Sequence, residues 1–113
     1  MNCKSTFKTL LKFGVIPIVN ENDTVATDEI RYGDNDRLAA QVASICECDL
    51  LILLSDIDGL YTEPPKKSKN AKHIPFISEI TDEIELMAEG PENDFSHGGM
   101  KTKIEAAKVT TSV

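Results

Sequence analysis

Two of the polar clusters in this sequence combine amide and carboxylate side chains over a short distance. They are the runs Asn-Glu-Asn-Asp at residues 20–23 and Gly-Asp-Asn-Asp at residues 33–36. Such side chains can accept hydrogen bonds from an ammonium group, and the amides can donate to a carboxylate. The same residue types are the usual ones in turns and helix caps, so each run alone also has a purely structural interpretation. Their position on either side of one short segment favours a shared binding function.

A hydroxyl and a carboxylate follow the most apolar run of the chain. Ser55 and Asp56 come directly after residues 50–54. In a parallel sheet the ends of the strands are where ligands bind, so the pair is suited to a nucleotide or a metal ion. The alternative is a simple turn in which Gly59 supplies a positive φ angle.

Paired glycines and lysines make up the last cluster, Gly-Gly-Met-Lys-Thr-Lys at residues 98–103. Glycines let backbone N–H groups approach an anion, and a helix that begins here adds a partial positive charge. Lys103 is placed to reach a phosphate or a phosphoryl group in transfer. The pattern is not that of a P-loop, and a glycine-rich loop with a solvated lysine is the alternative.

Together the clusters indicate phosphoryl transfer, in which a protein mainly positions the reactants and stabilises charge. No Ser/His/Asp triad is indicated, because neither His73 nor His97 lies in a nucleophile motif. His97 stands beside the paired glycines, where it either contacts a phosphate or is solvated.

Hydrophobic periodicity predicts the elements that must position these residues. Helices are expected at residues 6–13, 37–46, 81–87 and 100–109, with Gly14 ending the first and Thr81 capping the third. Strands are expected at residues 15–19 and 50–54, the latter buried on both faces, with a small hairpin at 25–32 and a short strand at 74–77. This order predicts an α/β fold, a layer of mainly parallel strands covered by helices.

Composition narrows the class of protein. The 113 residues suffice for one domain, and a net charge of -7 argues against a general nucleic-acid binder. The run at 50–54 is too short to cross a membrane, and Lys4, Lys8 and Lys12 interrupt any signal peptide, so a cytoplasmic location is expected. Three cysteines without a secretory signal argue against a disulfide framework, and the spacing of Cys46 and Cys48 is too short for the usual zinc knuckle.

In order and spacing, the runs at residues 15–25, 32–36, 51–61 and 98–103 resemble those of the glutamate 5-kinases, a branch of the amino acid kinase family. The similarity extends from about residue 2 to the end of the chain. The Asn-Glu-Asn-Asp and Gly-Asp-Asn-Asp segments distinguish this branch from acetylglutamate kinases, aspartokinases and uridylate kinases. The resemblance implies an αβα sandwich around a mainly parallel sheet.

The resemblance also implies an activity and a set of site residues. The family branch uses ATP and Mg²⁺ to convert L-glutamate to γ-glutamyl phosphate, the first step of proline biosynthesis. Asp23 and Asn35 match residues that hold glutamate, and Asp36 matches an acidic residue that organises catalytic lysines. Lys103 matches a lysine that neutralises the phosphoryl group, and no residue is assigned as a metal ligand. Residues that match nucleotide contacts are Ser55, Asp56, His97, Gly98, Gly99, Met100, Lys101, Thr102 and Lys103.

Two departures from the family pattern are visible. Members often carry threonine or a small residue at the position of His97. The family's kinase domain is about twice as long as this chain, and its opening strand carries a lysine and a phosphate-binding loop that these 113 residues do not include. We therefore expect residues 1–113 to be a partial amino acid kinase domain, without a C-terminal RNA-modification-type domain, from an enzyme that is a homo-oligomer. A different amino acid kinase and a non-catalytic binding or assembly domain are the alternatives.

The isolated 113-residue chain is expected to be inactive, because phosphoryl transfer requires donor phosphates and acceptor carboxylate to be held together. Loss of one charge-stabilising group alone typically costs on the order of 10²-fold in rate. The measurement is ADP release from ATP and Mg²⁺, with and without glutamate. Glutamate-dependent release at about 1 s⁻¹ or faster would contradict the expectation.

Overall fold

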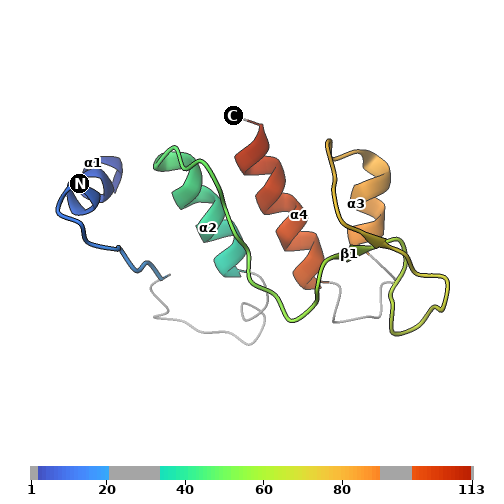
Figure 1. The fold of residues 1–113 in the computed structure, drawn as a ribbon. Helices are drawn as coiled ribbons and strands as arrows, with labels where there is room; N and C mark the ends of the chain where they lie inside the picture. The colour runs from blue at the N-terminus through green and yellow to red at the C-terminus, as the bar shows by residue number, and fades with distance from the viewer. Residues whose placement is uncertain (1–2, 21–33, 90–97, 113) are drawn as a thin grey trace.

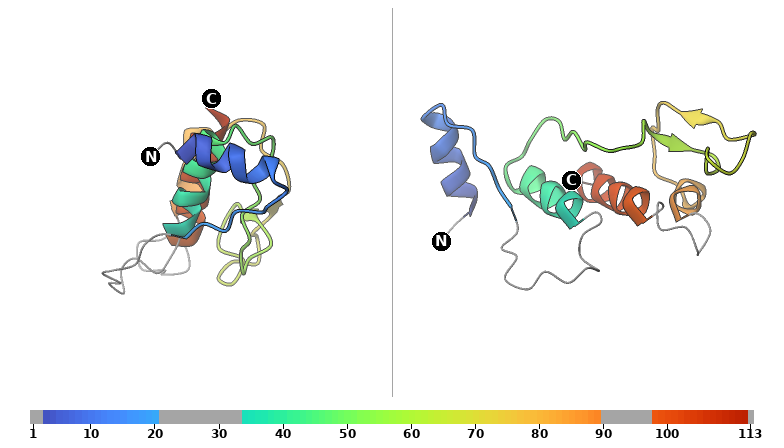
Figure 2. Two further views of the ribbon diagram at one scale, coloured as in Figure 1. Left: turned by 90° about the vertical axis from the view of Figure 1, so that its left-hand side faces the viewer. Right: turned by 90° about the horizontal axis from the view of Figure 1, so that it is seen from below.

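The computed structural model describes residues 3–20, 34–89 and 98–112. The helices are α1 (Cys3–Lys12), α2 (Asp34–Ile45), α3 (Asp82–Glu89) and α4 (Gly98–Thr111), and the strands are β1 (Leu60–Tyr61) and β2 (His73–Ile74). The helices stand in a row in the order α1, α2, α4, α3 (Figure 1). Seen from below, the extended chain after α2 runs along one side of this row (Figure 2).

The helices α2 and α4 pack together through small side chains. Ala40 and Ala106 are each 1% exposed, and Ala43 is also buried. Side chains of this size let two helix backbones approach closely, which favours dense packing with few voids. The predicted hydrophobic stripe of α2 is only partly buried, because Ile45 at its end is 42% exposed.

A small hydrophobic core joins α3, α4 and the two strands. Leu60, Ala88 and Ile104 are buried at its centre, and half-buried side chains pack around them: Ile74, Ile77, Ile80, Ile84, Met87 and Met100. The strands pair antiparallel, with Leu60 opposite Ile74. This cluster fixes the start of α4 against the rest of the chain, because both Met100 and Ile104 belong to it.

The four predicted helices are confirmed to within about three residues at each end, and two predicted end residues, Gly14 and Thr81, act as expected. Gly14 has a φ angle of +73°, and the N–H of Val15 donates to the carbonyl of Leu10 at 3.1 Å, which is a glycine-terminated Schellman ending. At α3, the hydroxyl of Thr81 accepts from the N–H of Ile84 at 3.3 Å, as an N-cap does. The helix α4 begins at Gly98 instead of residue 100, so both glycines belong to its first turn.

The strand predictions agree less well with the structure than the helix predictions do. Residues 15–19 and 50–54 are extended but have no strand assignment, and the hairpin predicted at 25–32 lies outside the described residues. The prediction that residues 50–54 are buried on both faces is wrong for this structure, since Leu50, Ile52 and Leu54 are 74%, 70% and 89% exposed. The physical reason is that no described strand pairs with this segment, so nothing covers its second face.

Sheet pairing in the described part of the chain is antiparallel and limited to β1 and β2. The short strand predicted at 74–77 is shifted to His73–Ile74. The structure is thus α/β in content, while the mainly parallel sheet stays a prediction. The radius of gyration of the Cα atoms is 16.1 Å, compared with about 13 Å for a compact domain of this length. The helices stand in one row (Figure 1), and the resulting elongated shape, 50 × 35 × 22 Å along its principal axes, accounts for this difference.

Among the helices that the structure describes, none has the length and apolar character needed to cross a membrane.

The close approach of Gly59 to His73 generates a prediction. Gly59 has a φ angle of +156°, and a Cβ atom added there would lie 2.4 Å from Nε2 of His73. We expect Gly59→Ala to lower the free energy of unfolding by about 1 kcal/mol or more, because the new methyl group must displace the imidazole from Tyr61. Urea unfolding followed by circular dichroism measures this change.

Gly99→Ala is the matched control, because a Cβ atom at this helical position meets nothing within 4 Å. It is expected to be neutral or to raise the free energy of unfolding by up to about 1 kcal/mol. In a His73→Ala background the cost of Gly59→Ala should fall. Equal stability of Gly59→Ala and the unmodified chain would contradict the prediction.

Candidate functional site

The first turns of α2 and α4 lie side by side at one end of the helical layer. Both helices run in the same direction, and both begin at this end (Figures 1 and 2). The Gly-Asp-Asn-Asp segment leads into α2, and the Gly-Gly-Met-Lys-Thr-Lys segment opens α4. Two of the predicted clusters, more than sixty residues apart in sequence, are therefore brought together by packing of the two helices.

Asp36 and Lys103 form an ion pair across this junction. Nζ of Lys103 lies 2.9 Å from Oδ2 of Asp36, and the two side chains are only 18% and 12% exposed, respectively. Removing opposite charges from water is costly, and their attraction compensates only where the geometry is good. At this distance the contact is a charge-assisted hydrogen bond, so each charge stabilises the other in a largely buried position.

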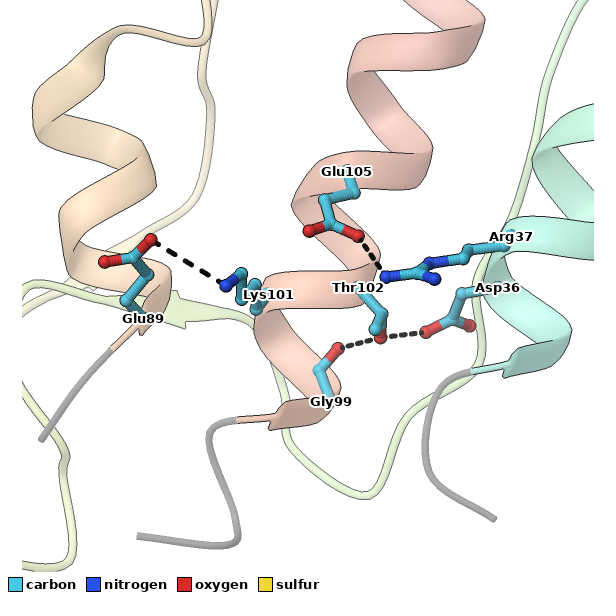
Figure 3. A network of polar contacts seen from close by, with 7 residues as sticks. All are labelled: Asp36, Arg37, Glu89, Gly99, Lys101, Thr102 and Glu105. Carbon is cyan, nitrogen blue, oxygen red and sulfur yellow. Dashed lines mark hydrogen bonds and ion pairs between the residues drawn. The ribbon is translucent and has the colours of Figure 1, made fainter. Parts of the chain in front are cut away.

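Thr102 contributes a second contact to the same carboxylate oxygen. Its hydroxyl lies 3.1 Å from Oδ2 of Asp36 and 2.9 Å from the backbone carbonyl oxygen of Gly99, and it can donate to either (Figure 3). Consecutive residues of α4, Thr102 and Lys103, therefore both contact Asp36. The carboxylate is held from two directions by one turn of the facing helix.

Two more ion pairs flank this network (Figure 3). Arg37 and Glu105 join α2 to α4 at 2.9 Å, with side chains 62% and 39% exposed. Lys101 and Glu89 link α4 to α3 at 3.9 Å, and both are about half exposed. Exposed pairs of this kind stabilise a fold by less than about 1 kcal/mol. They keep the two neighbouring helices in register at the start of α4 and add little to stability.

Ser55 and Asp56 occupy an exposed turn after the apolar run. The hydroxyl of Ser55 accepts from the N–H of Ile57 at 3.3 Å, a local turn contact. In Figure 1 the loop that follows residues 50–54 reaches the same end of the helical layer as the starts of α2 and α4. The assignment of Ser55 and Asp56 to the nucleotide stays a prediction, and the hydroxyl of Ser55 is engaged within its own turn.

Some predicted site residues cannot be placed with the rest. Asp23 and His97 lie outside the described residues. The predicted shared pocket of Asp23 and Asn35 therefore stays a prediction, with Asn35 exposed in the first turn of α2. A Cβ atom added at Gly99 would meet nothing within 4 Å. The first N–H groups of a helix have no partner within it, which leaves them free to bind an anion.

A separate polar contact lies at the strand pair. The hydroxyl of Tyr61 donates to the carboxylate of Asp58, with 3.0 and 3.1 Å to its two oxygens. This hydrogen bond, with smaller effects from burial and from the charge of Asp58, raises the pKa of Tyr61. The ring of Tyr61 also packs against that of His73 at a centroid distance of 5.1 Å. The turn after Asp56 is thus fixed by side chains as well as by Gly59.

The cysteines show no arrangement typical of a reactive or metal-binding site. Cys3, Cys46 and Cys48 are all free thiols. Burial, with the neighbouring Cys48 as a smaller cause, raises the pKa of Cys46, which disfavours the reactive thiolate form. Within residues 3–20, 34–89 and 98–112, no three His, Cys, Asp or Glu side chains come together as a metal site would require.

A cavity of about 520 Å³ lies near the C-terminal ends of α2 and α4, away from the ends at which both helices begin. Its lining includes Ala43, Leu51, Leu53, Ala107 and Thr110, and none of the predicted site residues. Leu51 and Leu53 form the half-buried face of the extended run at residues 50–54. The cavity therefore lies between this run and the two helices. Its position separates it from the Asp36 and Lys103 pair.

The structure adds residues that the sequence reasoning assigned otherwise or overlooked. Thr102 was expected only at the nucleotide, and its contact with Asp36 links it to the other cluster. The Arg37 and Glu105 pair was not anticipated. A signal existed: each helix carries an acidic and a basic residue close together, Asp36 with Arg37 on α2 and Lys103 with Glu105 on α4, in opposite order along the two helices. Such complementary charge patterns are typical of facing helix surfaces.

Comparison with known proteins extends these observations beyond the described residues. A profile of the amino acid kinase family matches residues 2–110. The chain belongs to the amino acid kinase family. Among relatives in this family, the glutamate 5-kinase of Allorhizobium ampelinum is 62% identical over 112 residues, which are 99% of this chain and 29% of that protein. The glutamate 5-kinase of Bartonella henselae is 58% identical over 112 residues, 99% of this chain and 30% of that protein.

A third amino acid kinase family relative, the glutamate 5-kinase of Bradyrhizobium diazoefficiens, is 59% identical over 112 residues, 99% of this chain and 30% of that protein. The chain thus spans about three tenths of the length of the relatives that it matches. The resemblance noted from the four sequence runs is confirmed at the level of the family. Identity of this degree extends over nearly the whole chain and is not restricted to the polar clusters.

The two ion pairs between α2 and α4 allow a matched comparison. We expect Asp36→Asn to lower the free energy of unfolding by about 2 kcal/mol, because it leaves the largely buried Lys103 ammonium without a counter-charge. Glu105→Gln makes the same chemical change in an exposed pair and should cost less than about 1 kcal/mol. Urea unfolding of both variants measures the difference. Equal costs for the two substitutions would show that burial of the Asp36 pair has no energetic consequence.

Proposed function

We propose that this chain forms part of a glutamate 5-kinase, an enzyme that transfers the γ-phosphoryl group of ATP to the γ-carboxylate of L-glutamate. The observation that carries the proposal is the convergence of Asp36 and Lys103 at 2.9 Å, in a chain 62% identical to a glutamate 5-kinase over 112 residues. A cation held by a carboxylate at the start of two helices is suited to a reaction in which negative charge is moved. The product, γ-glutamyl phosphate, is the first intermediate of proline biosynthesis.

In the proposed reaction a γ-carboxylate oxygen of glutamate attacks the γ-phosphorus of ATP, and ADP leaves as the bond to its β-phosphate oxygen breaks. The ammonium of Lys103 neutralises charge on the phosphoryl group during transfer. Asp36 holds Lys103 in place, since an unpaired lysine of this length would sample many conformations. Asp23 and Asn35 are proposed to bind glutamate, through its ammonium and carboxylate groups.

The start of α4 is proposed to bind the phosphates of ATP. The N–H groups of its first turn have no partner within the helix, and together with the partial positive charge of the helix end they favour an anion there. The open space at Gly99 supports this proposal, because phosphate oxygens can approach the backbone without meeting a side chain. The residues assigned to the nucleotide are Ser55, Asp56, His97, Gly98, Gly99, Met100, Lys101, Thr102 and Lys103.

Mg²⁺ is proposed to enter the site with ATP. The described residues contain no cluster of three acidic, cysteine or histidine side chains, so they fit a metal held mainly by phosphate oxygens and not by a protein cage. When bound, the metal offsets the charge of the phosphates. Asp56, exposed in the loop beyond residues 50–54, is the described carboxylate that the family resemblance places at the nucleotide.

The wider architecture follows from the same proposal. Residues 15–19 and 50–54 are proposed to be strands of a mainly parallel sheet in an αβα sandwich, completed by other parts of the enzyme. Exposure of apolar side chains on both segments supports this, with Ile16 at 85% and Ile18 at 95%. Unpaired apolar edges of this kind invite pairing with another strand. We further propose that the enzyme is a homo-oligomer and that it lies in the cytoplasm, where ATP and glutamate are both available to it.

A chimeric enzyme tests the proposal directly. The matching 112-residue stretch of the Allorhizobium ampelinum protein is replaced by this chain, and ADP release is measured with glutamate, aspartate and acetylglutamate. Release that depends on glutamate alone is the expected result. Release with another acceptor would indicate a different amino acid kinase. An inactive chimera that still binds ATP and glutamate in calorimetry would support a non-catalytic binding or assembly role.

Lys103→Ala in this chimera is expected to lower kcat by about 10²-fold or more, with a much smaller change in the KM for ATP. The reason is that the ammonium interacts most strongly with charge developed in the transition state. Lys108→Ala is the matched control, because Lys108 pairs with Glu85 farther along the same helix. A Lys103→Ala enzyme with unchanged kcat would exclude the role assigned to this lysine.

A further inference from the structure

The hydroxyl of Thr102 stands between two acceptors but has one proton to donate. Oδ2 of Asp36 lies 3.1 Å away on α2, and the carbonyl oxygen of Gly99 lies 2.9 Å away in the preceding turn of α4 (Figure 3). A hydroxyl proton rotates to suit its surroundings. Donation to Asp36 joins the helices, whereas donation to Gly99 keeps the bond within α4.

Oδ2 of Asp36 likewise accepts from two donors. Lys103 approaches this atom at 2.9 Å and Thr102 at 3.1 Å. Donors on one oxygen share its negative charge, so a bond from the hydroxyl weakens the attraction that retains the ammonium. Asp36, taken as a whole residue, is 9% exposed, and water competes poorly for a carboxylate in such a position.

We propose that Thr102 is a positioning residue that acts through Asp36: its hydroxyl fixes the carboxylate and, by sharing Oδ2, loosens its hold on Lys103. When the proton turns to Gly99, the carboxylate retains Lys103 more tightly. When it turns to Asp36, the ammonium is freer to move toward a phosphoryl group. The proposal rests on the proposed kinase function and assigns to Thr102 a role separate from contact with the nucleotide.

Other threonines of α4 behave differently, which argues against a general helix effect. Thr110 donates only to carbonyl oxygens of its own helix, Ala106 and Ala107, at 3.1 Å in each case. Thr111 likewise donates to Ala107. Bonds of this kind are common for threonine within helices. Among the described threonines of α4, the contact of Thr102 with a carboxylate on another helix is therefore distinctive.

The kinetic test uses the chimera with three substitutions in this chain. Thr102→Val keeps the shape and removes the hydroxyl, and we expect it to lower kcat about tenfold, the effect of one hydrogen bond to a charged group. The KM values for ATP and glutamate should change less than about threefold if Thr102 acts through Asp36. Thr102→Ser keeps the hydroxyl and should restore most of kcat. Thr110→Val, the control, should leave both parameters unchanged.

A second measurement is independent of catalysis and uses the 113-residue chain. Thr102→Val is made in the unmodified chain and in an Asp36→Ala background, and the urea midpoint of each is determined. If the hydroxyl bonds to the carboxylate, the midpoint shift caused by Thr102→Val should be at least halved once Asp36 is absent. Thr110→Val should shift the midpoint equally in both backgrounds.

The outcomes separate this proposal from the proposed function. An inactive chimera overturns the kinase function, and the unfolding cycle then decides whether Thr102 and Asp36 are coupled. An active chimera in which Thr102→Val keeps kcat overturns the positioning role and leaves the kinase function intact. A rise in the KM for ATP with kcat unchanged would show that Thr102 acts only through its contact with the nucleotide, and would overturn the positioning role. Additive midpoint shifts would overturn the coupling itself.

Discussion

The ion pair between Asp36 and Lys103 joins the first turn of α2 to the second turn of α4 across a separation of 67 residues in sequence. A largely buried charge needs a partner of opposite sign, and this requirement fixes the relative position of α2 and α4. Ala40 and Ala106 allow the helix backbones to come near enough for the contact. The packing and the pair therefore depend on each other, and Thr102 completes the arrangement on the same carboxylate.

Burial distinguishes this pair from its neighbours more than distance does. Arg37 and Glu105 also meet at 2.9 Å, but their side chains are far more exposed, so water and salt screen the attraction. Lys101 and Glu89 are exposed and farther apart. Because the Asp36 and Lys103 side chains are largely shielded from water, their attraction is screened less than that of the two exposed pairs.

The extended segments present a different physical situation. Residues 50–54 pack one face toward α2 and α4 and leave the other to solvent, where Ile52 is 70% exposed. Hydrophobic side chains on unpaired backbone favour the addition of another strand. The chain belongs to the amino acid kinase family and spans about three tenths of the length of its glutamate 5-kinase relatives.

Local sequence determined the helices and their ends, because caps and stops depend on near neighbours. Gly14 and Thr81 act as predicted, and the apolar periodicity placed all four helices within a few residues of their observed bounds. The clusters at Asp36 and Lys103 were also visible in the sequence, and their resemblance to a family was enough to connect them to one reaction. Tertiary structure determined which side chains contact one another and which are buried, because local sequence patterns do not encode these properties.

Which atoms meet is a property of packing. The sharing of Oδ2 by Lys103 and Thr102 depends on the approach of α2 to α4, and the sequence indicated only that both clusters contained charges. Burial of residues 50–54 failed as a prediction for a related reason: an apolar run indicates what a strand tends to bury, but only the strands and helices beside it determine what is covered.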